Sequence, residues 1–375
     1  MNKFRQWISV SLLVVGLAGC SSSEQPNPVK VIEIDPDLPA MTEQEMAAHF
    51  TGDRFVVLKG ALLGQIDRIL DWGDRYVVCD VKERQVVIFD TTGHCITQIQ
   101  RVGKGPGEYG MLMDCAIESV RDELVLYAKN PGKLLWFDRD GKFLREKSLE
   151  VSNFWEVSRA GDGLAGVNLA GVTMAERTIS LIGPDGEVDP EGLLPMRSGM
   201  PNISLGRWLI CNGAETWLSR PFDYTFYAFD PETRRFEARY SLDLGRAELP
   251  ESEISQQMDL QAIFDARRVF HVNNVAPVGR YLIFDTACGC YLYDPEAVQL
   301  MKMGKMTVCG VPNTAVGYRF LENQNRRIVR LIYPDRLESR INQLGDSGVS
   351  RTLLDSLIAE NSAEMNPVLL LQEVH

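Results

Sequence analysis

The sequence has 375 residues, of which 45% are hydrophobic and 24% are charged, with 31 glycines and 18 prolines. These proportions are those of an ordinary globular protein, and they exclude a mostly disordered, collagen-like or coiled-coil chain. The formal net charge is −12, and no run of Lys or Arg offsets it. Because sequence-independent binding to nucleic acid requires such basic patches, we expect no nucleic-acid partner.

The N-terminus has the three parts of a secretory signal. Lys3 and Arg5 form a short basic region, and residues 7–17 are mostly apolar but too few to span a bilayer. The residues Leu-Ala-Gly-Cys (17–20) follow, and they resemble the bacterial lipobox, whose cysteine is acylated and becomes the mature N-terminus. The pattern favours a lipoprotein signal over an ordinary cleaved signal peptide or a signal anchor.

This signal predicts the location of the mature protein. We expect a signal peptide over residues 1–19. Cys20 is expected to carry two or three acyl chains, palmitate among them, and residues 20–50 are expected to form a tether that begins with a Ser- and Pro-rich stretch. Ser21 is not Asp, so retention in the inner membrane is not indicated. The prediction is a lipid-anchored protein of the cell envelope, at the periplasmic or surface face of the outer membrane.

The cysteines predict neither a redox site nor a metal site. Apart from Cys20 there are seven cysteines, an odd number for an oxidising compartment. Cys288 and Cys290 flank Gly289 and form the one close pair, but no further ligand lies at the usual zinc spacing. A turn between two buried thiols is favoured over a disulfide or a metal site, and we predict no cofactor here.

An internal repeat indicates the fold. Residues 76–96 align with residues 124–144 without a gap, and both contain two apolar strands, a Phe-Asp pair, a turn with Gly and a third strand. Looser copies occur at 179–188, 224–242 and 281–300. Strand-rich repeats of about 45 residues, with turn signals every 8 to 12 residues, are typical of propeller blades.

We therefore predict an all-β protein, a six-bladed β-propeller over residues 51–375. Five blades are assigned to residues 65–100, 111–150, 154–194, 205–245 and 269–308. A sixth blade begins with two strands, VGYRFLEN (316–323) and RIVRLIYP (327–334), and then stops short of a full sheet. The strands at 55–60 and 365–374 can complete it, so that the two chain ends close the ring and cover its open sheet edges. Seven blades remain an alternative, because the body also divides into units of about 45 residues.

Two segments interrupt the strand pattern. Residues 248–270 and 335–362 both contain apolar residues at helical spacing. In the first segment the stripe consists of Ile254, Met258, Ala262, Ala266 and Phe270. We predict inserted helices in both, and a helix that packs on the propeller is favoured over one that docks a partner.

A glycine-rich sequence joins the first two blades. It is RVGKGPGEY (101–109), and it resembles the R-x-G-x-G-P-G-E-Y signature of six-bladed β-propeller lipoproteins common in Bacteroides-type bacteria. That family is similar to the NHL-repeat propellers, and the Asn366-Pro367 pair before the last strand also resembles it. The resemblance covers nearly the whole mature chain. It implies the fold and the location, and it carries no common activity.

The residues of this loop indicate a structural role. Gly103, Gly105 and Gly107 permit positive φ and close packing where the chain crosses between blades, and Pro106 stiffens the path. The sequence lacks the Lys-Ser/Thr ending of a P-loop. We expect these four residues to shape the blade crossing, and phosphate binding is the less favoured alternative.

Five residues are the candidates for a weak binding site. Glu108 is expected to accept hydrogen bonds from loop amides, with the Tyr109 ring beneath them, while Arg101 and Lys104 could contact an anionic ligand. His271 begins a predicted innermost strand and could line the central channel, although a structural histidine is favoured.

No catalytic constellation is recognisable. The sequence contains no G-x-S-x-G, H-E-x-x-H or EF-hand pattern, so we assign no catalytic residue and no metal ligand. We expect a monomeric body that acts as a binding or scaffold module for a glycan, a peptide or a protein. The alternative is an NHL-like lyase or hydrolase with a divalent metal in the axial channel. Three or more converging His, Asp or Glu side chains would favour the enzyme, and a shallow surface lined by Arg and aromatic residues would favour binding.

Overall fold

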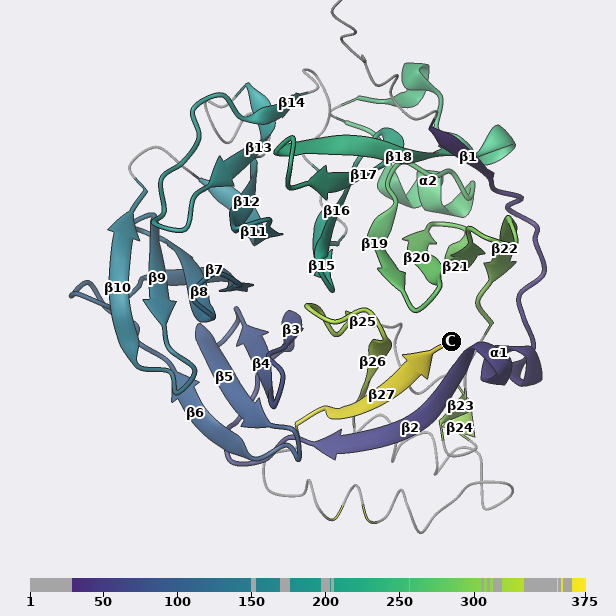
Figure 1. Cartoon of the computed structure of the whole chain (residues 1–375). Helices are drawn as coiled ribbons and strands as arrows, with labels where there is room; N and C mark the ends of the chain where they lie inside the picture. Colours follow the sequence, from purple (N-terminus) through teal and green to yellow (C-terminus); the bar gives the residue numbers. More distant parts are fainter. Residues whose placement is uncertain are drawn as a thin grey trace, which may run out of the picture.

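Six sheets surround a central axis in the computed structural model (Figure 1). The structure describes residues 29–149, 153–168, 176–196, 203, 206–255, 257–304, 307–308, 311–312, 319–333, 356, 359 and 366–375. The six-bladed β-propeller is confirmed, and the seven-bladed alternative is wrong. Each of the five predicted blade ranges matches four consecutive strands of one sheet, with β14 ending one residue beyond its range.

Each blade runs from an innermost strand at the axis to an outermost strand at the rim. Blade 1 contains β3 (Arg68–Asp71), β4 (Arg75–Asp80), β5 (Gln85–Asp90) and β6 (Cys95–Ile99). Blade 2 contains β7 (Met111–Glu118), β8 (Glu123–Lys129), β9 (Lys133–Phe137) and β10 (Phe143–Ser148). Blade 3 contains β11 (Phe154–Ala160), β12 (Gly163–Asn168), β13 (Arg177–Ile182) and β14 (Leu193–Pro195).

The second half of the ring follows the same order. Blade 4 contains β15 (Leu209–Asn212), β16 (Glu215–Arg220), β17 (Asp223–Asp230) and β18 (Arg235–Asp243). Blade 5 contains β19 (Asn273–Val278), β20 (Tyr281–Thr286), β21 (Gly289–Asp294) and β22 (Gln299–Lys302). Blade 6 contains β25 (Arg319–Phe320), β26 (Arg327–Ile332), β27 (Val368–Val374) and β2 (Phe50–Val57). A separate hairpin pairs β23 (Thr307–Val308) with β24 (Val311–Pro312).

The repeated Phe-Asp-x-x-Gly sequence forms the outer hairpin of blades 1 and 2. The Asp90 carboxylate accepts a hydrogen bond from the Thr92 amide at 2.8 Å, and Gly93 adopts a φ of 95°. Asp138 and Gly141 repeat this turn in blade 2, where Gly141 has a φ of 75°. Because glycine tolerates positive φ and aspartate bonds its own turn, this short sequence specifies the hairpin.

The hydrophobic core is divided among the six interfaces between neighbouring blades. The middle strands β4, β5, β8 and β9 are buried almost throughout, whereas β6 and β10 alternate between half-buried and exposed residues. One apolar cluster joins each pair of adjacent blades, including the pair formed by blades 6 and 1. Each blade is therefore stabilised from both faces, and the last interface depends on ring closure.

The two chain ends close the ring within blade 6, as predicted. β27 pairs with β26 on one side and with β2 on the other, in the register Phe50↔Val374 to Val57↔Val368. The buried side chain of Asn366 donates to the carbonyls of Leu58 and Ala61 and accepts from the Leu63 amide. This amide holds the segment after β2 beside the start of β27, so the Asn-Pro pair has a structural role.

The N-terminal segment before β2 is attached along the rim of the propeller. The predicted tether over 20–50 contains β1 (Lys30–Glu33), which pairs in parallel with β18 as a fifth strand of blade 4. The Met41 amide then donates to the Lys302 carbonyl of blade 5, and α1 (Glu43–His49) leads directly into β2. Only residues 20–28 of that range lie outside the described part of the chain. Residues 29–49 therefore bind three successive blades and do not form a free linker.

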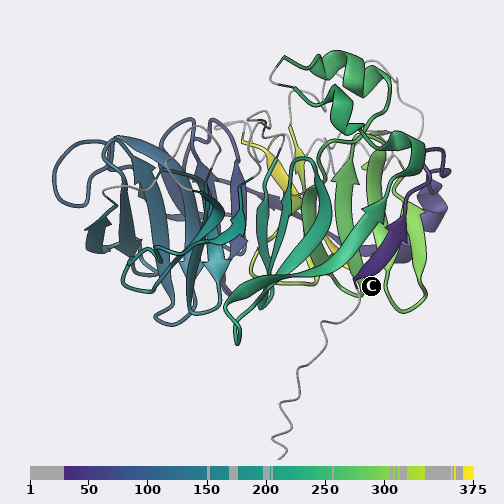
Figure 2. The same cartoon turned by 90° about the horizontal axis from the view of Figure 1, so that it is seen from above.

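The insertion after blade 4 stands on one face of the ring (Figure 2). It contains two short 3-10 helices, η1 (Gly245–Ala247) and η2 (Glu251–Glu253), and α2 (Leu260–Asp265). The helices predicted in 248–270 are present but short: α2 has one buried residue, Ile263, and the apolar residues around it pack on Phe222 and Phe270 as a small separate core rather than along one helical stripe. The helices predicted over 335–362 lie almost wholly outside the described residues. Within the described part, no helix is long and apolar enough to cross a membrane.

Candidate functional site

Five charged side chains meet near the propeller axis. Arg68, Asp114 and Glu156 come from the innermost strands of blades 1, 2 and 3, Arg207 precedes the innermost strand of blade 4, and Glu322 follows that of blade 6. We call these five residues the axial cluster. Four of them are buried, and Arg207 is partly exposed. Buried charges are costly unless they are paired, so the contacts within the cluster decide its role.

Arg68 is the centre of the axial cluster. Its guanidinium forms a two-pronged pair with Glu322, with Nε 2.8 Å from Oε1, and its Nη1 lies 3.3 Å from Asp114 Oδ1. The same group donates to the Val157 carbonyl at 2.8 Å and to the Ser158 hydroxyl at 3.0 Å. One side chain therefore joins blades 1, 2, 3 and 6.

Arg207 lies within 4 Å of all three acidic side chains of the cluster. Its Nη2 donates to Asp114 Oδ2 at 2.9 Å, and its other nitrogens lie 3.8 Å from Glu156 and 3.7 Å from Glu322. Glu156 also accepts the amides of Trp208 and Leu209 at 2.8 and 2.6 Å. Three carboxylates thus converge at the axis, but two guanidiniums lie among them.

The ionisation of the cluster follows from burial and pairing. Burial opposes the charge on Asp114, but Arg207 and Arg68 outweigh it and lower the pKa of that carboxyl below its usual range. Burial dominates at Glu156 and raises its pKa to about 7 against the attraction of Arg207. With Glu156 protonated, two carboxylates balance two guanidiniums. No group of three or more potential metal ligands occurs among the described residues. The cluster is an internal brace, and its arginines would repel a divalent cation.

The Glu156 carboxyl should make stability depend on pH. Its pKa in the folded protein is about 7 against 4.5 for the free side chain, so the folded state binds more protons between these values. The free energy of unfolding should therefore fall as pH rises from about 4.5 to 7, by at most about 1.4 kcal/mol per pH unit. Urea unfolding of Glu156→Gln and wild type across this range measures the contribution. The difference between the two proteins should change with pH, and a constant difference would contradict the assignment.

His271 lies two residues before β19, the innermost strand of blade 5. Its side chain is 3% exposed, neither ring nitrogen has a hydrogen-bond partner among the described residues, and the ring meets that of Trp208 edge-on at 6.1 Å. Burial lowers the pKa of His271 to about 3, so the imidazole is neutral. It therefore does not join the candidate binding residues of the glycine-rich loop.

The glycine-rich loop crosses from β6 to β7 as a compact turn. The Tyr109 amide donates to the Arg101 carbonyl at 2.9 Å, and the Gly103 amide donates to the Tyr109 carbonyl at 3.0 Å. Glu108 Oε2 accepts the Gly105 amide at 2.8 Å. The buried Tyr109 hydroxyl donates to backbone carbonyls of blade 1. Glu108 and Tyr109 are therefore occupied by internal bonds.

The two basic residues of this loop face solvent. Arg101 and Lys104 are exposed, and the Arg101 guanidinium lies 5.3 Å from the centre of the Phe143 ring. Neither lies beside His271 or the axial cluster in the contacts of the described residues. Pro106 is exposed as well. The five candidate residues therefore lie in two separate places, four of them in the loop and His271 against Trp208, and do not form one site.

The glycines of the loop differ in whether their positions could accommodate a larger side chain. Gly107 has a φ of 70°, and an added Cβ would lie 3.0 Å from the Phe143 ring, whereas at Gly105 the φ is ordinary and the nearest atom is the movable Glu108 carboxylate at 3.1 Å. We expect Gly107→Val to lower the free energy of unfolding by about 1–3 kcal/mol and Gly105→Val by less. Chemical denaturation measures both. Equal losses at the two positions would contradict a role for positive φ.

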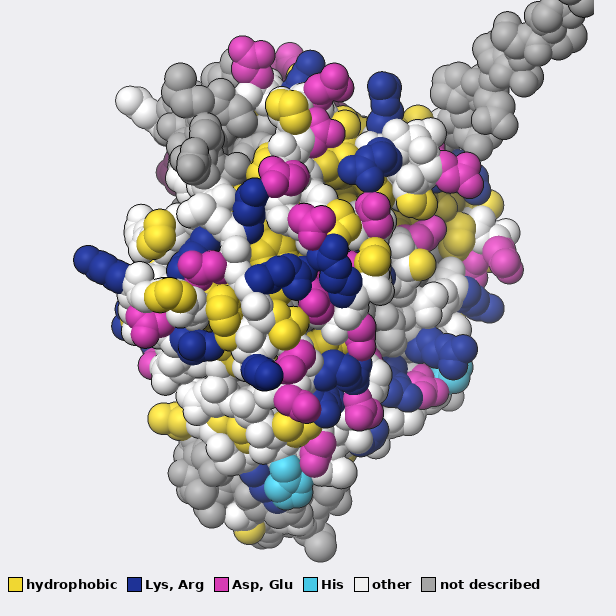
Figure 3. Space-filling model, turned by 60° about the vertical axis from the view of Figure 1, so that its left-hand side comes forward, with side chains coloured by type: hydrophobic (Ala, Val, Ile, Leu, Met, Phe, Trp, Pro, Cys, Tyr) yellow, Lys and Arg dark blue, Asp and Glu magenta, His cyan; other side chains and the backbone are white. Residues whose placement is uncertain are grey.

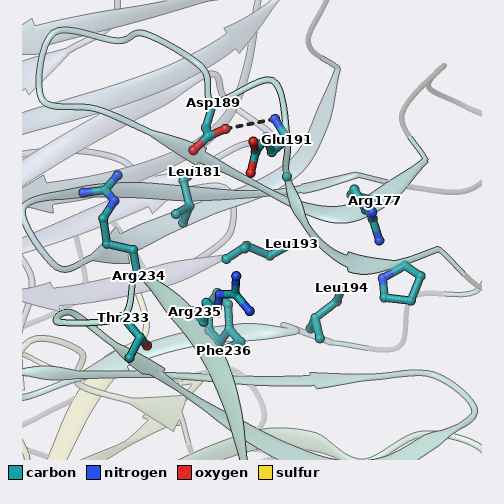
Figure 4. A pocket seen from close by; sticks show the side chains of 12 residues that line it. Arg177, Leu181, Asp189, Glu191, Leu193, Leu194, Thr233, Arg234, Arg235 and Phe236 are labelled. Carbon is teal, nitrogen blue, oxygen red and sulfur yellow. Dashed lines mark hydrogen bonds between the residues drawn. The ribbon is translucent and has the colours of Figure 1, made fainter. Parts of the chain in front are cut away.

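A hollow of about 690 Å³ opens at the rim between blades 3 and 4 (Figure 4). The charged side chains Arg177, Arg234 and Arg235 lie around it, together with Asp189 and Glu191 from the turn between β13 and β14. Its apolar part consists of Leu181, Leu193, Leu194 and Phe236. We call this the rim hollow. It lies at the rim rather than at the axial channel, and its lining combines arginines with aliphatic side chains.

The three arginines of the rim hollow differ in whether they form an ion pair. Arg234 pairs with Asp162 at 3.2 Å, while Arg177 and Arg235 are exposed and form no ion pair in the described part of the chain. The Asp189 carboxylate accepts the Glu191 amide at 2.9 Å. Elsewhere on this flank of the molecule, basic and acidic side chains alternate (Figure 3). Two guanidiniums are therefore available to an anionic group.

Neither the axial cluster nor the rim hollow was predicted. Their residues come from separate blades and form no motif, since Arg68 and Glu322 are 254 positions apart. A signal for the cluster does exist. Charged residues lie within the apolar innermost strands of blades 1, 2 and 3 and beside those of blades 4 and 6, and His271 stands beside that of blade 5. The rim hollow has no such signal, because turns and outer strands are polar in every blade.

Solved structures share the fold. A protein described as exported, from Bacteroides fragilis, is 16% identical and superposes with a TM-score of 0.71 over 93% of this chain and all of its own. BamB from Moraxella catarrhalis is 14% identical, with a TM-score of 0.43 over 74% of this chain and 75% of its own. A virginiamycin B lyase from Staphylococcus aureus is 13% identical, with a TM-score of 0.41 over 75% and 85%. The first supports the propeller fold, and the other two are too distant to support any argument.

No curated protein matches the sequence. A family model matches residues 59–373, from the segment after β2 to the end of β27. That range includes the glycine-rich loop, the axial cluster and the rim hollow. The chain therefore belongs to the family described as Domain of unknown function (DUF4934).

Proposed function

We propose that this protein is a lipid-anchored binding module of the cell envelope, whose propeller body is monomeric and holds a glycan, a peptide or a protein at the rim hollow. The observation that carries the proposal is the contrast between the two charged sites. At the axis, every carboxylate is bonded to an arginine or a backbone amide. At the rim, Arg177 and Arg235 are exposed beside an apolar floor.

The anchor is proposed from Cys20, which lies outside the described residues. Nine residues separate it from β1, so a fully extended leash would reach roughly 30 Å. Because residues 29–49 bind blades 4, 5 and 6, such a leash holds the whole body close to the bilayer. The related fold from Bacteroides fragilis is described as exported, which agrees with a secretory signal.

Changing the lipidated cysteine tests the anchor. Cys20→Ser should abolish incorporation of labelled palmitate and leave unprocessed precursor or released protein, because the lipobox requires a thiol. Fractionation of envelope and medium, with palmitate labelling, makes the measurement. Wild-type amounts of acylated, membrane-bound protein in this variant would contradict the proposed anchor.

Ligand binding is tested on the full-length chain in mild detergent. A panel of acidic, neutral and basic oligosaccharides and peptides should include members that raise the melting temperature of the wild type. The same ligands should not stabilise a variant with Arg177→Gln and Arg235→Gln. Arg239→Gln is the matched control, since Arg239 is exposed on β18 but does not line the rim hollow. Ligands that stabilise all three proteins equally would place binding elsewhere and overturn the proposal.

A further inference from the structure

A sheet edge forms one wall of the rim hollow. β14 is the last strand of blade 3, and no described strand pairs with its outer edge. The next blade differs, because β1 covers the outer edge of β18 there. Exposed edges are templates for an additional strand, and this protein already adds an extended segment of its own chain to the adjacent blade.

The side chains beside this edge define the charge of a ligand. Arg177 lies at the start of β13, opposite Pro195 of β14, and Arg235 begins β18 across the hollow. In Figure 4, Arg177 lies to the right of Leu193 and Arg235 below it, while Asp189 and Glu191 lie above Leu193. Planar guanidiniums bind carboxylates through two parallel hydrogen bonds, so the pair suits an acidic ligand.

The apolar side chains of the rim hollow favour a peptide ligand over a sugar. Leu193 and Leu194 are half-buried, and the one aromatic ring, Phe236, is buried. The hollow thus offers aliphatic side chains and backbone rather than a flat aromatic face. Leu194 also has a φ of 57°, a costly conformation for leucine, and such residues often occur where a ligand is contacted. The Pro195 carbonyl is already bonded to Arg220, so the free edge is short.

We propose that the rim hollow binds an extended acidic peptide segment of a partner protein, which adds to the outer edge of β14 and places carboxylates on Arg177 and Arg235. The inference rests on the proposed function and names its ligand. Although the protein has a net charge of −12, exposed charges beyond about 8 Å are largely screened at physiological salt. The charges that matter are therefore local, and the proposed peptide places its carboxylates at Arg177 and Arg235, on the walls away from the turn that carries Asp189 and Glu191.

The first experiment measures binding of a fluorescent peptide, Gly-Ser-Glu-Val-Glu-Val-Glu-Gly-Ser, to the full-length chain by anisotropy. Arg177→Gln with Arg235→Gln should weaken binding at least tenfold, and 0.3 M salt should weaken binding to the wild type. Arg239→Gln should bind like the wild type. A Lys-for-Glu peptide should not bind. Equal binding by the double variant and the wild type, with equal melting temperatures, would overturn the inference.

The second experiment separates strand addition from simple charge attraction. A peptide with the same side chains but N-methylated at alternate residues cannot donate backbone hydrogen bonds from the methylated edge, so of the two such peptides the one methylated on the edge that faces β14 should bind at least tenfold more weakly. Equal affinity would overturn strand addition. An oligogalacturonate that binds and is lost in the arginine variant, without peptide binding, would overturn the peptide ligand yet leave the proposed function standing. If neither the acidic peptide nor the oligogalacturonate binds, the peptide inference is overturned but the proposed function stands. If no ligand of the whole panel has an effect, both the inference and the proposed function are overturned.

Discussion

Arg68→Met should lower the free energy of unfolding by about 3–5 kcal/mol, the usual cost of removing one partner from a buried ion pair. The variant leaves Asp114 and Glu322 buried, with Arg207 as the only remaining guanidinium of the axial cluster. It also removes the hydrogen bonds from Arg68 to the Val157 carbonyl and the Ser158 hydroxyl. Urea unfolding followed by tryptophan fluorescence measures the loss.

The control is an arginine of the same charge at the surface. Arg121 pairs with Asp185 at 2.8 Å, and both side chains are exposed. Arg121→Met should therefore cost less than about 1 kcal/mol. If Arg68→Met does not fold, Glu322→Gln should still lose stability, and combining the two changes should cost less than the sum of their separate effects. A loss at Arg68 no larger than that at Arg121 would show that the axial cluster does not brace the ring.

The fold was largely predictable because it depends on local and repeated signals. The Asp90–Gly93 and Asp138–Gly141 turns specify hairpins through their own backbone geometry, and the alternating strands indicate which face is buried. Ring closure was predictable for a different reason. A strand at 365–374 without a neighbour in sequence requires a partner, and the strand near 55–60 was the one left over.

The sites were less predictable because they depend on distances between blades. Arg68 and Arg207 become neighbours of Asp114 only when the ring is closed, so no local pattern contains them. The helical stripe in the insertion misled for a related reason, because Ile263 and Phe270 pack on Phe222 of blade 4 rather than along one helix. In both cases tertiary contacts outweigh local spacing. The hydrogen bonds that hold Glu108 and Tyr109 inside their loop are likewise set by that fold.

Removing residues 366–375 should abolish the cooperative unfolding of the native body. β27 lies between β26 and β2 in the sheet of blade 6. Its side chains Val368, Leu369, Leu370 and Leu371 are at most 1% exposed. Four such side chains contribute on the order of 6–12 kcal/mol through burial, which equals the whole stability of many domains. The deletion also separates β2 from β26 and leaves two sheet edges uncovered. Calorimetry and size-exclusion chromatography should show a non-cooperative, aggregating chain.

A point variant keeps this prediction testable if the truncated chain cannot be isolated. Leu369→Ala should lower the free energy of unfolding by about 2–5 kcal/mol, since it leaves a cavity between blades 6 and 1. Val298→Ala, at a residue that is 74% exposed in the turn between β21 and β22, should change it by less than about 0.5 kcal/mol. A synthetic peptide of residues 366–375 should restore cooperative melting to the truncated chain, because a ligand of the folded state stabilises it in proportion to its concentration. A truncated chain that melts like the full-length protein would mean that β27 does not hold the ring together, and that blade 6 is closed by other contacts.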